Sequence, residues 1–172
     1  LSLRRQRQMC IRDRAIYAQQ QQKSLAQVLG GTQQKIEVGI SIGLQPTDAA
    51  LITTIQRFLD EGYKRIKVKI KPGKDIELLR TIRNAFPEIP LMADANSSYT
   101  LEDVALLKQL DQFNLMMIEQ PLAYDDVLDH AKLQQHIKTP ICLDESITSL
   151  DDARKAIEVG GCGVVTVSYT HL

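Results

Sequence analysis

The chain has 172 residues with 21 basic and 21 acidic side chains, so its formal net charge is zero. This balance excludes a bulk electrostatic attraction to nucleic acid or to a membrane surface, and the hydrophobic content of 44% fits one ordinary globular domain. No apolar run is long enough to span a bilayer. The three cysteines have no CxxC spacing, which argues against a disulfide framework and favours a reducing, cytoplasmic location.

The two ends of the chain differ from the rest in composition. Residues 1–14 carry half of the ten arginines, and residues 166–172 stop abruptly after an apolar run. We expect both segments to be non-native tails and the chain to be an internal fragment of a longer protein. A basic arm that contacts RNA or DNA is the alternative for residues 1–14, but it has no interleaved aromatic side chains.

Between the ends, apolar periodicity predicts one helix and then a regular alternation of strands and helices. The first helix covers residues 15–29, and Gly30-Gly31 suits its C-terminus. The predicted strands are residues 35–43, 65–70, 90–95, 114–121, 139–146 and 163–167. The predicted helices between them are residues 48–62, 75–86, 100–110, 125–138 and 149–161. Acids three residues after Thr100 and Ser149 indicate helix starts of the capping-box type.

This alternation predicts an α/β fold with a parallel sheet, because short apolar strands followed by helices are typical of repeated βα units. About five to six such units lie within residues 32–165, which is part of a (β/α)8 TIM-type barrel. No glycine-rich phosphate loop follows any strand, so nucleotide binding has no support. We expect Cys142 and Cys162 in the core, and His130 and His136 at the surface.

One spacing in the chain is informative about chemistry. Successive members of a lysine-and-acid series are each 25 residues apart: Lys69, Asp94, Glu119 and Asp144. Each lies at or near the C-terminal end of a predicted strand, and one βα unit here is about 25 residues long. Because active sites of (β/α)8 barrels form at the C-terminal ends of the strands, we expect these side chains around the barrel mouth.

Each acid alone has an ordinary structural interpretation. Asp94 could cap the next helix, Glu119 could be a solvated strand end, and Asp144 could be a turn residue. Together, three carboxylates on adjacent strands would repel one another and would need a compensating cation. An all-oxygen triad suits Mg²⁺ or Mn²⁺. The alternative is a barrel whose charges are structural and bind no metal.

The strand at residues 65–70 places cations beside these acids. Lys67 and Lys69 share a face that would point into the barrel, while Ile66, Val68 and Ile70 would pack outward against helices. Like-charge proximity and partial burial lower a lysine pKa, so one of these amines could accept a proton near neutral pH. A base beside a divalent metal suits removal of a proton α to a carboxylate, with the metal stabilising the enediolate.

Four segments, "KVK", "DANSSYT", "MMIEQPL" and "TPICLDES", together resemble the enolase superfamily, muconate-cycloisomerase-like subgroup, over residues 15–165. The likeness is strongest to the o-succinylbenzoate synthases and N-acylamino acid racemases of that subgroup. It implies Lys69 as the general base, Lys67 as its electrostatic partner, and Asn96 close to the metal or substrate. It implies a Mg²⁺ site formed by Asp94, Glu119 and Asp144.

The resemblance also implies an activity and its alternatives. The implied reaction is that of a carbon–oxygen lyase of menaquinone biosynthesis acting on a small-molecule carboxylate, in an enzyme that could be a homo-oligomer. N-acylamino acid racemase, dipeptide epimerase and muconate cycloisomerase remain alternatives, because the subgroup shares these motifs. No nucleic-acid or membrane partner is implied.

The chain departs from the subgroup's pattern at its sixth strand. The subgroup has N-I-K there, with a second lysine, whereas this chain has Thr166-Val167-Ser168. Residues 15–31 resemble the last helix of an α+β capping domain whose other parts are missing. We therefore expect this chain alone to be inactive.

Overall fold

The computed structural model describes residues 3–33 and 35–166. Two compact units are present: Glu37–Thr166 form the larger one, and the smaller one contains the first two helices. Within the described residues, no helix combines the length and the apolar character that crossing a membrane requires.

The smaller unit corrects the helix predicted over residues 15–29. Helix α1 spans Leu3–Gln20, and a separate short helix α2 spans Leu25–Val28. The helix breaks because Gln22 has a left-handed φ of 53° and Ser24 begins α2 with a reciprocal capping box to Gln27. Gly30 follows at φ 80°, as expected of a residue after a helix end.

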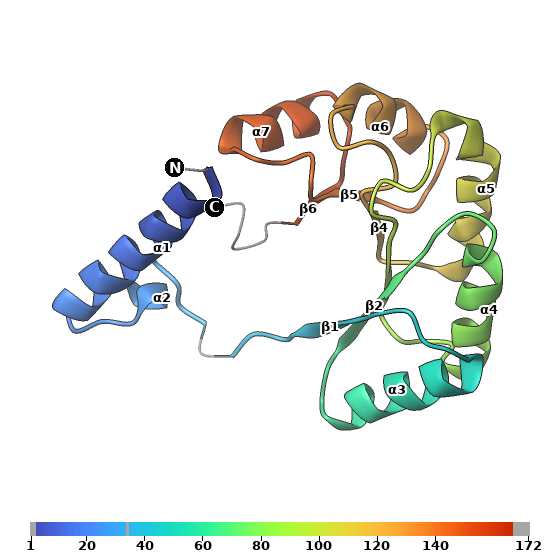
Figure 1. Ribbon diagram of the computed structural model, residues 1–172, viewed down its shortest axis with the longest axis horizontal. Helices are drawn as coiled ribbons and strands as arrows, with labels where there is room; N and C mark the ends of the chain where they lie inside the picture. Colours follow the sequence, from blue (N-terminus) through green and yellow to red (C-terminus); the bar gives the residue numbers. More distant parts are fainter. Residues whose placement is uncertain (1–2, 34, 167–172) are drawn as a thin grey trace. The chain divides into compact units, whose positions relative to one another are not determined.

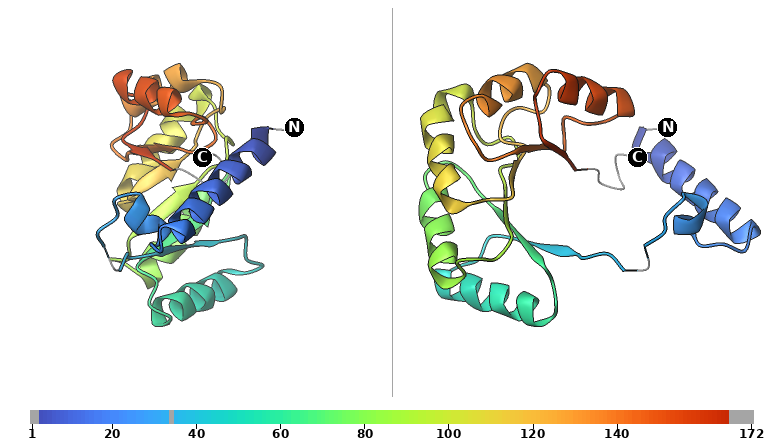
Figure 2. Two further views of the ribbon diagram at one scale, coloured as in Figure 1. Left: turned by 90° about the vertical axis from the view of Figure 1, so that its left-hand side faces the viewer. Right: turned by 180° about the vertical axis from the view of Figure 1, so that it is seen from behind.

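The larger unit is a parallel sheet in which sequential strands are neighbours. Its six strands among the described residues pair in the order β1-β2-β3-β4-β5-β6, and every pairing is parallel. The helices of this unit lie along the outer side of the curved sheet in Figure 1 and in the right-hand view of Figure 2. The strands are Gly39–Ile42 (β1), Arg65–Lys69 (β2), Leu91–Asp94 (β3), Met117–Glu119 (β4), Ile141–Leu143 (β5) and Val164–Val165 (β6). The predicted fold class, a partial (β/α)8 barrel, is confirmed.

The predicted helices are present between these strands, most of them shorter than expected. They are Asp48–Asp60 (α3), Asp75–Ala85 (α4), Val104–Gln109 (α5), Val127–Gln134 (α6) and Leu150–Glu158 (α7), with 3-10 turns at Leu101–Asp103 (η1) and Leu110–Phe113 (η2). Thr100 forms the expected capping box with Asp103, although the first turn there is 3-10. Ser149 caps α7 through the N–H of Asp152.

The core lies between the sheet and these helices. On β2, Ile66 and Val68 are buried while the lysines that alternate with them are only partly covered, which confirms the predicted outward packing of the aliphatic residues. Every residue of β4 and β5 is buried, as expected of parallel strands with both faces covered. Cys142 and Cys162 are buried, in agreement with prediction.

Two polar side chains join segments at the N-terminal end of the sheet. Arg83, near the end of α4, donates hydrogen bonds of 2.7–3.4 Å to the backbone carbonyl oxygens of Phe86, Pro87, Ile89, Phe113 and Asn114. Asp111 accepts bonds of 2.7–3.1 Å from both backbone N–H groups of Lys138 and Thr139 and from the Thr139 hydroxyl. Burial alone would raise the pKa of Asp111. These hydrogen bonds outweigh burial, so the pKa lies below the ordinary aspartate value.

Candidate active site

The parallel pairing of β2, β3 and β4 aligns three of the four residues that are spaced 25 apart in the sequence. Lys69 pairs with Asp94 and Asp94 pairs with Glu119 across β2, β3 and β4. Glu119 then pairs with Cys142, so Asp144 lies two residues further along, just beyond the end of β5. Paired residues are 25 positions apart in sequence from β2 to β3 and from β3 to β4, but 23 positions apart from β4 to β5. The equal sequence spacing therefore describes the ladder up to Glu119 and not beyond it.

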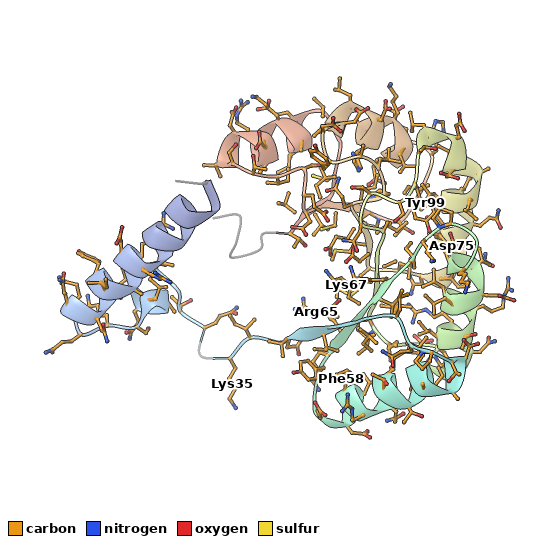
Figure 3. All side chains as sticks on the ribbon, in the orientation of Figure 1. Lys35, Phe58, Arg65, Lys67, Asp75 and Tyr99 are labelled. Carbon is orange, nitrogen blue, oxygen red and sulfur yellow. The ribbon has the colours of Figure 1, made fainter. Side chains whose placement is uncertain are left out.

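Lys67 forms an ion pair with Glu119. Its Nζ lies 2.7 and 2.8 Å from the two carboxylate oxygens, and 3.8 Å from Asp94 Oδ2. Figure 3 shows Lys67 on the inner, concave side of the sheet. Burial lowers the pKa of Lys67, but its bond to Glu119 and the charges of the neighbouring acids raise it above the ordinary lysine value overall. The expected lowering of a lysine pKa is therefore wrong for Lys67, because its carboxylate neighbours outweigh its burial.

Lys69 occupies a more open position on the same strand. Its Nζ lies 3.2 Å from Asp94 Oδ2 and donates a short hydrogen bond to Asn96 Oδ1. The side chain of Lys69 is 43% exposed against 21% for Lys67, so Lys69 is the more accessible of the two amines. Asn96 also donates its backbone N–H to Asp94 Oδ1 and its Nδ2 to Glu145 Oε1, each at 3.2 Å. Asn96 thus connects the lysine to two carboxylates.

The three predicted metal ligands influence one another electrostatically. The side chains of Asp94 and Glu119 are almost fully buried, at 6% and 3% exposure. Burial raises the pKa of Glu119, Lys67 lowers it, and repulsion from Asp94 and Asp144 raises it further, so that the net shift is upward. These carboxylates share one region of low dielectric, which favours a cation among them.

The donor chemistry of this region fits a hard divalent cation. Within residues 3–33 and 35–166, no group of three or more His, Cys, Asp or Glu side chains is assembled as a metal centre; two lysine amines lie against Glu119 and Asp94 instead. All candidate ligands are carboxylate oxygens, the donors that Mg²⁺ prefers. In addition, Glu145 Oε2 is buried without a hydrogen-bond partner among the described residues, so a further donor or cation could be accommodated there.

The loops that carry these side chains contain non-glycine residues in the left-handed region. Asn96 and Ser97, directly after β3, have φ values of 42° and 59°, and Gln120, directly after β4, has φ 41°. Such conformations are uncommon outside glycine and cost on the order of 1–3 kcal/mol each. Strain at both strand ends coincides with the candidate site.

Sequence comparison identifies the family to which this arrangement belongs. The family model "Enolase C-terminal domain-like" matches residues 50–172, which is most of the chain. The chain belongs to this family. Its named relatives are therefore members of the same family with which the chain can be compared.

Relatives of known name share high identity with this enolase-family chain. An o-succinylbenzoate synthase from Geobacillus kaustophilus is 59% identical over 152 residues, which are 88% of this chain and 40% of that protein. An N-succinylamino acid racemase from Thermus thermophilus is 56% identical over 150 residues, 87% of this chain and 41% of that protein. The chain thus spans about two fifths of the length of these relatives.

Solved structures support the same assignment. An enolase-superfamily protein from Listeria innocua superposes with a TM-score of 0.85 at 45% identity, over 90% of this chain and 42% of that one. A dipeptide epimerase from Cytophaga hutchinsonii, in a complex with Mg and a dipeptide, superposes with a TM-score of 0.77 at 26% identity, over 86% of this chain and 41% of that one. The predicted resemblance to the enolase superfamily is confirmed.

Sequence reasoning missed two buried polar residues of this enolase-family site. His130 was expected at the surface but has no exposed surface, because α6 turns this side chain toward the strand-end loops. His136 is exposed, as predicted. Gln120, which also has no exposed surface, bonds to the segment after β5. The only signal for Gln120 was its place directly after Glu119; nothing in the polar stretch around His130 indicated its burial.

Two cavities adjoin the lysine strand β2, one beside Lys67 and the other beside Lys69. One of about 490 Å³ lies on the inner side, where Lys67 and Glu119 contribute to its lining beside Met92 and Met117. The other, of about 440 Å³, is lined by Lys69 and by residues of the segments that follow β1 and β2. The sixth-strand segment Thr166-Val167-Ser168, where the subgroup has its second lysine, extends past the described residues, so the structure does not test that expectation at Ser168.

Proposed function

We propose that this chain carries the metal-binding acids and first two lysines of an o-succinylbenzoate synthase, a carbon–oxygen lyase acting on a small cyclohexadiene carboxylate. The observation that carries the proposal is the contact of Lys67 and Lys69 with Glu119 and Asp94 at neighbouring strand ends. The names of close relatives in Geobacillus and Bacillus support the choice of activity.

In the proposed reaction the two lysines have different tasks. Lys67, whose pKa is raised by its carboxylate neighbours, stays protonated and attracts the substrate carboxylate. Lys69 is more exposed and its Nζ is positioned by the Asn96 amide oxygen, so Lys69 is the more accessible of the two lysines to take the α proton. A Mg²⁺ or Mn²⁺ ion held by Asp94, Glu119 and Asp144 would neutralise the charge that develops on the carboxylate.

Racemisation of N-succinylamino acids is the second candidate, because the Thermus thermophilus relative of that name is 56% identical. Both reactions begin with loss of the same kind of proton, so residues 65–144 do not separate them. Racemisation additionally needs a group that returns the proton from the opposite face. The dipeptide epimerase and muconate cycloisomerase reactions have weaker support, because relatives with those activities are more distant.

A segment exchange tests the activity. Residues 15–165 of this chain would replace the aligned segment of the Geobacillus kaustophilus synthase, and the hybrid would be assayed with the cyclohexadiene substrate and with N-succinylamino acids. We expect the hybrid to catalyse dehydration. Lys69→Ala should lower the dehydration rate at least 1,000-fold. Lys71→Ala, which changes an exposed lysine two residues further on, should retain that rate. Racemisation without dehydration would select the alternative, and full activity in Lys69→Ala would remove the assigned base.

Calorimetric titration of the same hybrid with Mg²⁺ tests the assignment of the metal ligands separately. Glu119→Gln keeps the size of the side chain but removes its charge, so we expect Mg²⁺ affinity to fall at least tenfold. Glu102→Gln, an exposed glutamate at η1, is the matched control and should bind as the parent does. Equal affinity in both variants would exclude Glu119 as a ligand.

The remaining parts of the proposal concern the chain as a whole. We expect no dehydratase or racemase turnover from residues 1–172 alone, because the chain spans about two fifths of the length of its relatives. Residues 15–31 would then belong to a capping domain and residues 32–165 to the barrel. We place the complete enzyme in the cytoplasm as a possible homo-oligomer with no nucleic-acid partner. Ordinary turnover by the purified chain would refute the first expectation.

A further inference from the structure

The Gln120 side chain connects two strand ends of the site. Its Oε1 accepts the backbone N–H groups of Asp144 and Ser146 at 3.1 and 3.2 Å. Its Nε2 donates to the Ser146 hydroxyl at 2.7 Å and to the Leu122 carbonyl at 3.2 Å. Because backbone N–H groups can only donate, the orientation of this amide is determined by its partners. The side chain has no exposed surface.

The backbone of Gln120 connects the same region to a third strand. Its N–H donates to the Cys142 carbonyl, and its own carbonyl accepts the N–H of Ser97, both at 2.8 Å. Gln120 therefore contacts the segments that follow β3, β4 and β5. The segments after β3 and β4 begin directly after Asp94 and Glu119, and the segment after β5 begins with Asp144.

His130 supports Gln120 from α6. Its Nδ1 lies 2.7 Å from the Asp126 carbonyl oxygen, which can only accept, so Nδ1 carries the proton. Its Nε2 is then an acceptor; it receives the Leu122 N–H at 3.1 Å and lies 3.5 Å from Gln120 Nε2. This is the neutral tautomer of a fully buried imidazole. The ring thereby fixes both the turn at Leu122 and the amine end of Gln120.

The acids differ in how their backbones are held. Asp94 and Glu119 are members of ladder pairs, so hydrogen bonds between strands fix their positions. Asp144 lies beyond β5, and its backbone N–H is bonded to the Gln120 side chain instead of to a neighbouring strand. A glutamine amide thus performs at Asp144 the function that the ladder performs at Asp94 and Glu119.

We infer that Gln120, supported by the neutral imidazole of His130, is a positioning residue that fixes Asp144 relative to Glu119. It touches neither the lysines nor the substrate region through any bond of its side chain. Its effect on a cation or substrate rests on the proposed function, whereas its effect on the Asp144 backbone does not. The inference thus predicts a structural and a chemical consequence that can be measured separately.

The experiment uses the full chain with Gln120→Met, which keeps the side-chain length but removes all four amide hydrogen bonds. Hydrogen exchange of the backbone amides of Asp144 and Ser146 should accelerate at least tenfold relative to the other core amides. Mn²⁺ affinity, followed by electron paramagnetic resonance, should fall at least tenfold. Ile118→Val, a mild change at a fully buried position of β4, is the matched control. It should change neither the relative exchange rates of Asp144 and Ser146 nor the affinity for Mn²⁺.

A second variant covers the case in which Gln120→Met does not fold. Ser146→Ala removes only the 2.7 Å bond to the Gln120 amine, and a two- to threefold acceleration of exchange at Asp144 would support the inference. Exchange at Asp144 that matches the Ile118→Val control in every folded variant would overturn it. If the parent chain binds no Mn²⁺, the metal part of the proposed function fails, and the exchange rates still decide the inference.

Discussion

Replacing Arg83 by methionine should lower the free energy of unfolding by about 3–5 kcal/mol. The guanidinium donates to five backbone carbonyl oxygens, and its two shortest bonds, to Phe113 and Ile89, are 2.7 Å long. Hydrogen bonds to a charged group contribute about 1.5–3 kcal/mol each, so these two bonds account for most of the loss. The three longer bonds add a smaller amount. Methionine retains the aliphatic length and thereby isolates the polar contribution.

Urea denaturation at neutral pH measures this effect. Arg80→Met, an exposed arginine on the same helix, is the matched control and should change stability by less than about 0.5 kcal/mol. Arg83→Lys should recover less than half of the loss, because one ammonium group cannot reach carbonyls in two segments at once. If Arg83→Met lies within about 1 kcal/mol of Arg80→Met, the guanidinium does not join these segments in solution.

Three further predictions concern polar groups that are buried or partly buried. Because its hydrogen bonds lower the pKa of Asp111, the stability that this carboxylate contributes is complete above the ordinary aspartate value of about 3.9 and is lost as pH falls toward the lower folded pKa. Asp111→Asn should therefore be less stable by about 1–2 kcal/mol at pH 7, with a difference from the parent that shrinks below pH 4 in acid denaturation curves. Tyr99→Phe should cost about 1–3 kcal/mol in urea denaturation, because it removes the buried 2.7 Å bond to Asp75; both residues are labelled in Figure 3. A loss no larger than that of the exposed Tyr17→Phe would contradict this. Burial raises the pKa of the Cys142 thiol to about 11, so iodoacetamide at pH 8 should label it at least 100-fold more slowly in the native than in the urea-unfolded chain, as peptide mass spectrometry would show.

The type and order of the barrel elements could be predicted from sequence because the signal is local. Alternation of cations with isoleucine and valine defines β2, and apolar spacing defines the helices around it. Strand lengths could not be predicted: the apolar run of residues 115–118 lies within a predicted strand of residues 114–121, yet only Met117–Glu119 form the strand. The length of a strand depends on which of its residues face a neighbouring strand, and the local sequence pattern does not show this. The prediction over residues 15–29 was wrong because a cap at Ser24 interrupts a polar helix that has little apolar periodicity.

The candidate site was predictable where it depends on register and not where it depends on contacts between distant segments. The 25-residue spacing places Lys69, Asp94 and Glu119 in one ladder row, since each is one repeat from the next. Burial of His130 depends on the turn at Leu122, which local hydrophobicity does not reveal. The sign of the Lys67 pKa shift was missed for a similar reason. The sequence places both another lysine and the acids beside Lys67, but only the structure shows that the Lys67 amine lies 2.7 Å from Glu119, which makes the acids the stronger influence on its pKa.

The left-handed residues that follow β3 and β4 have a consequence for protein engineering. A stabilisation campaign guided by backbone preference would select Asn96, Ser97 and Gln120 for replacement by glycine, since glycine adopts these φ values without steric cost. Each replacement would relieve local strain, yet two of them would delete the amide that contacts Lys69 and the amide that bonds to Asp144. Sites of apparent weakness in this fold are therefore positions to protect during such redesign, and melting temperature alone would reward the wrong variants.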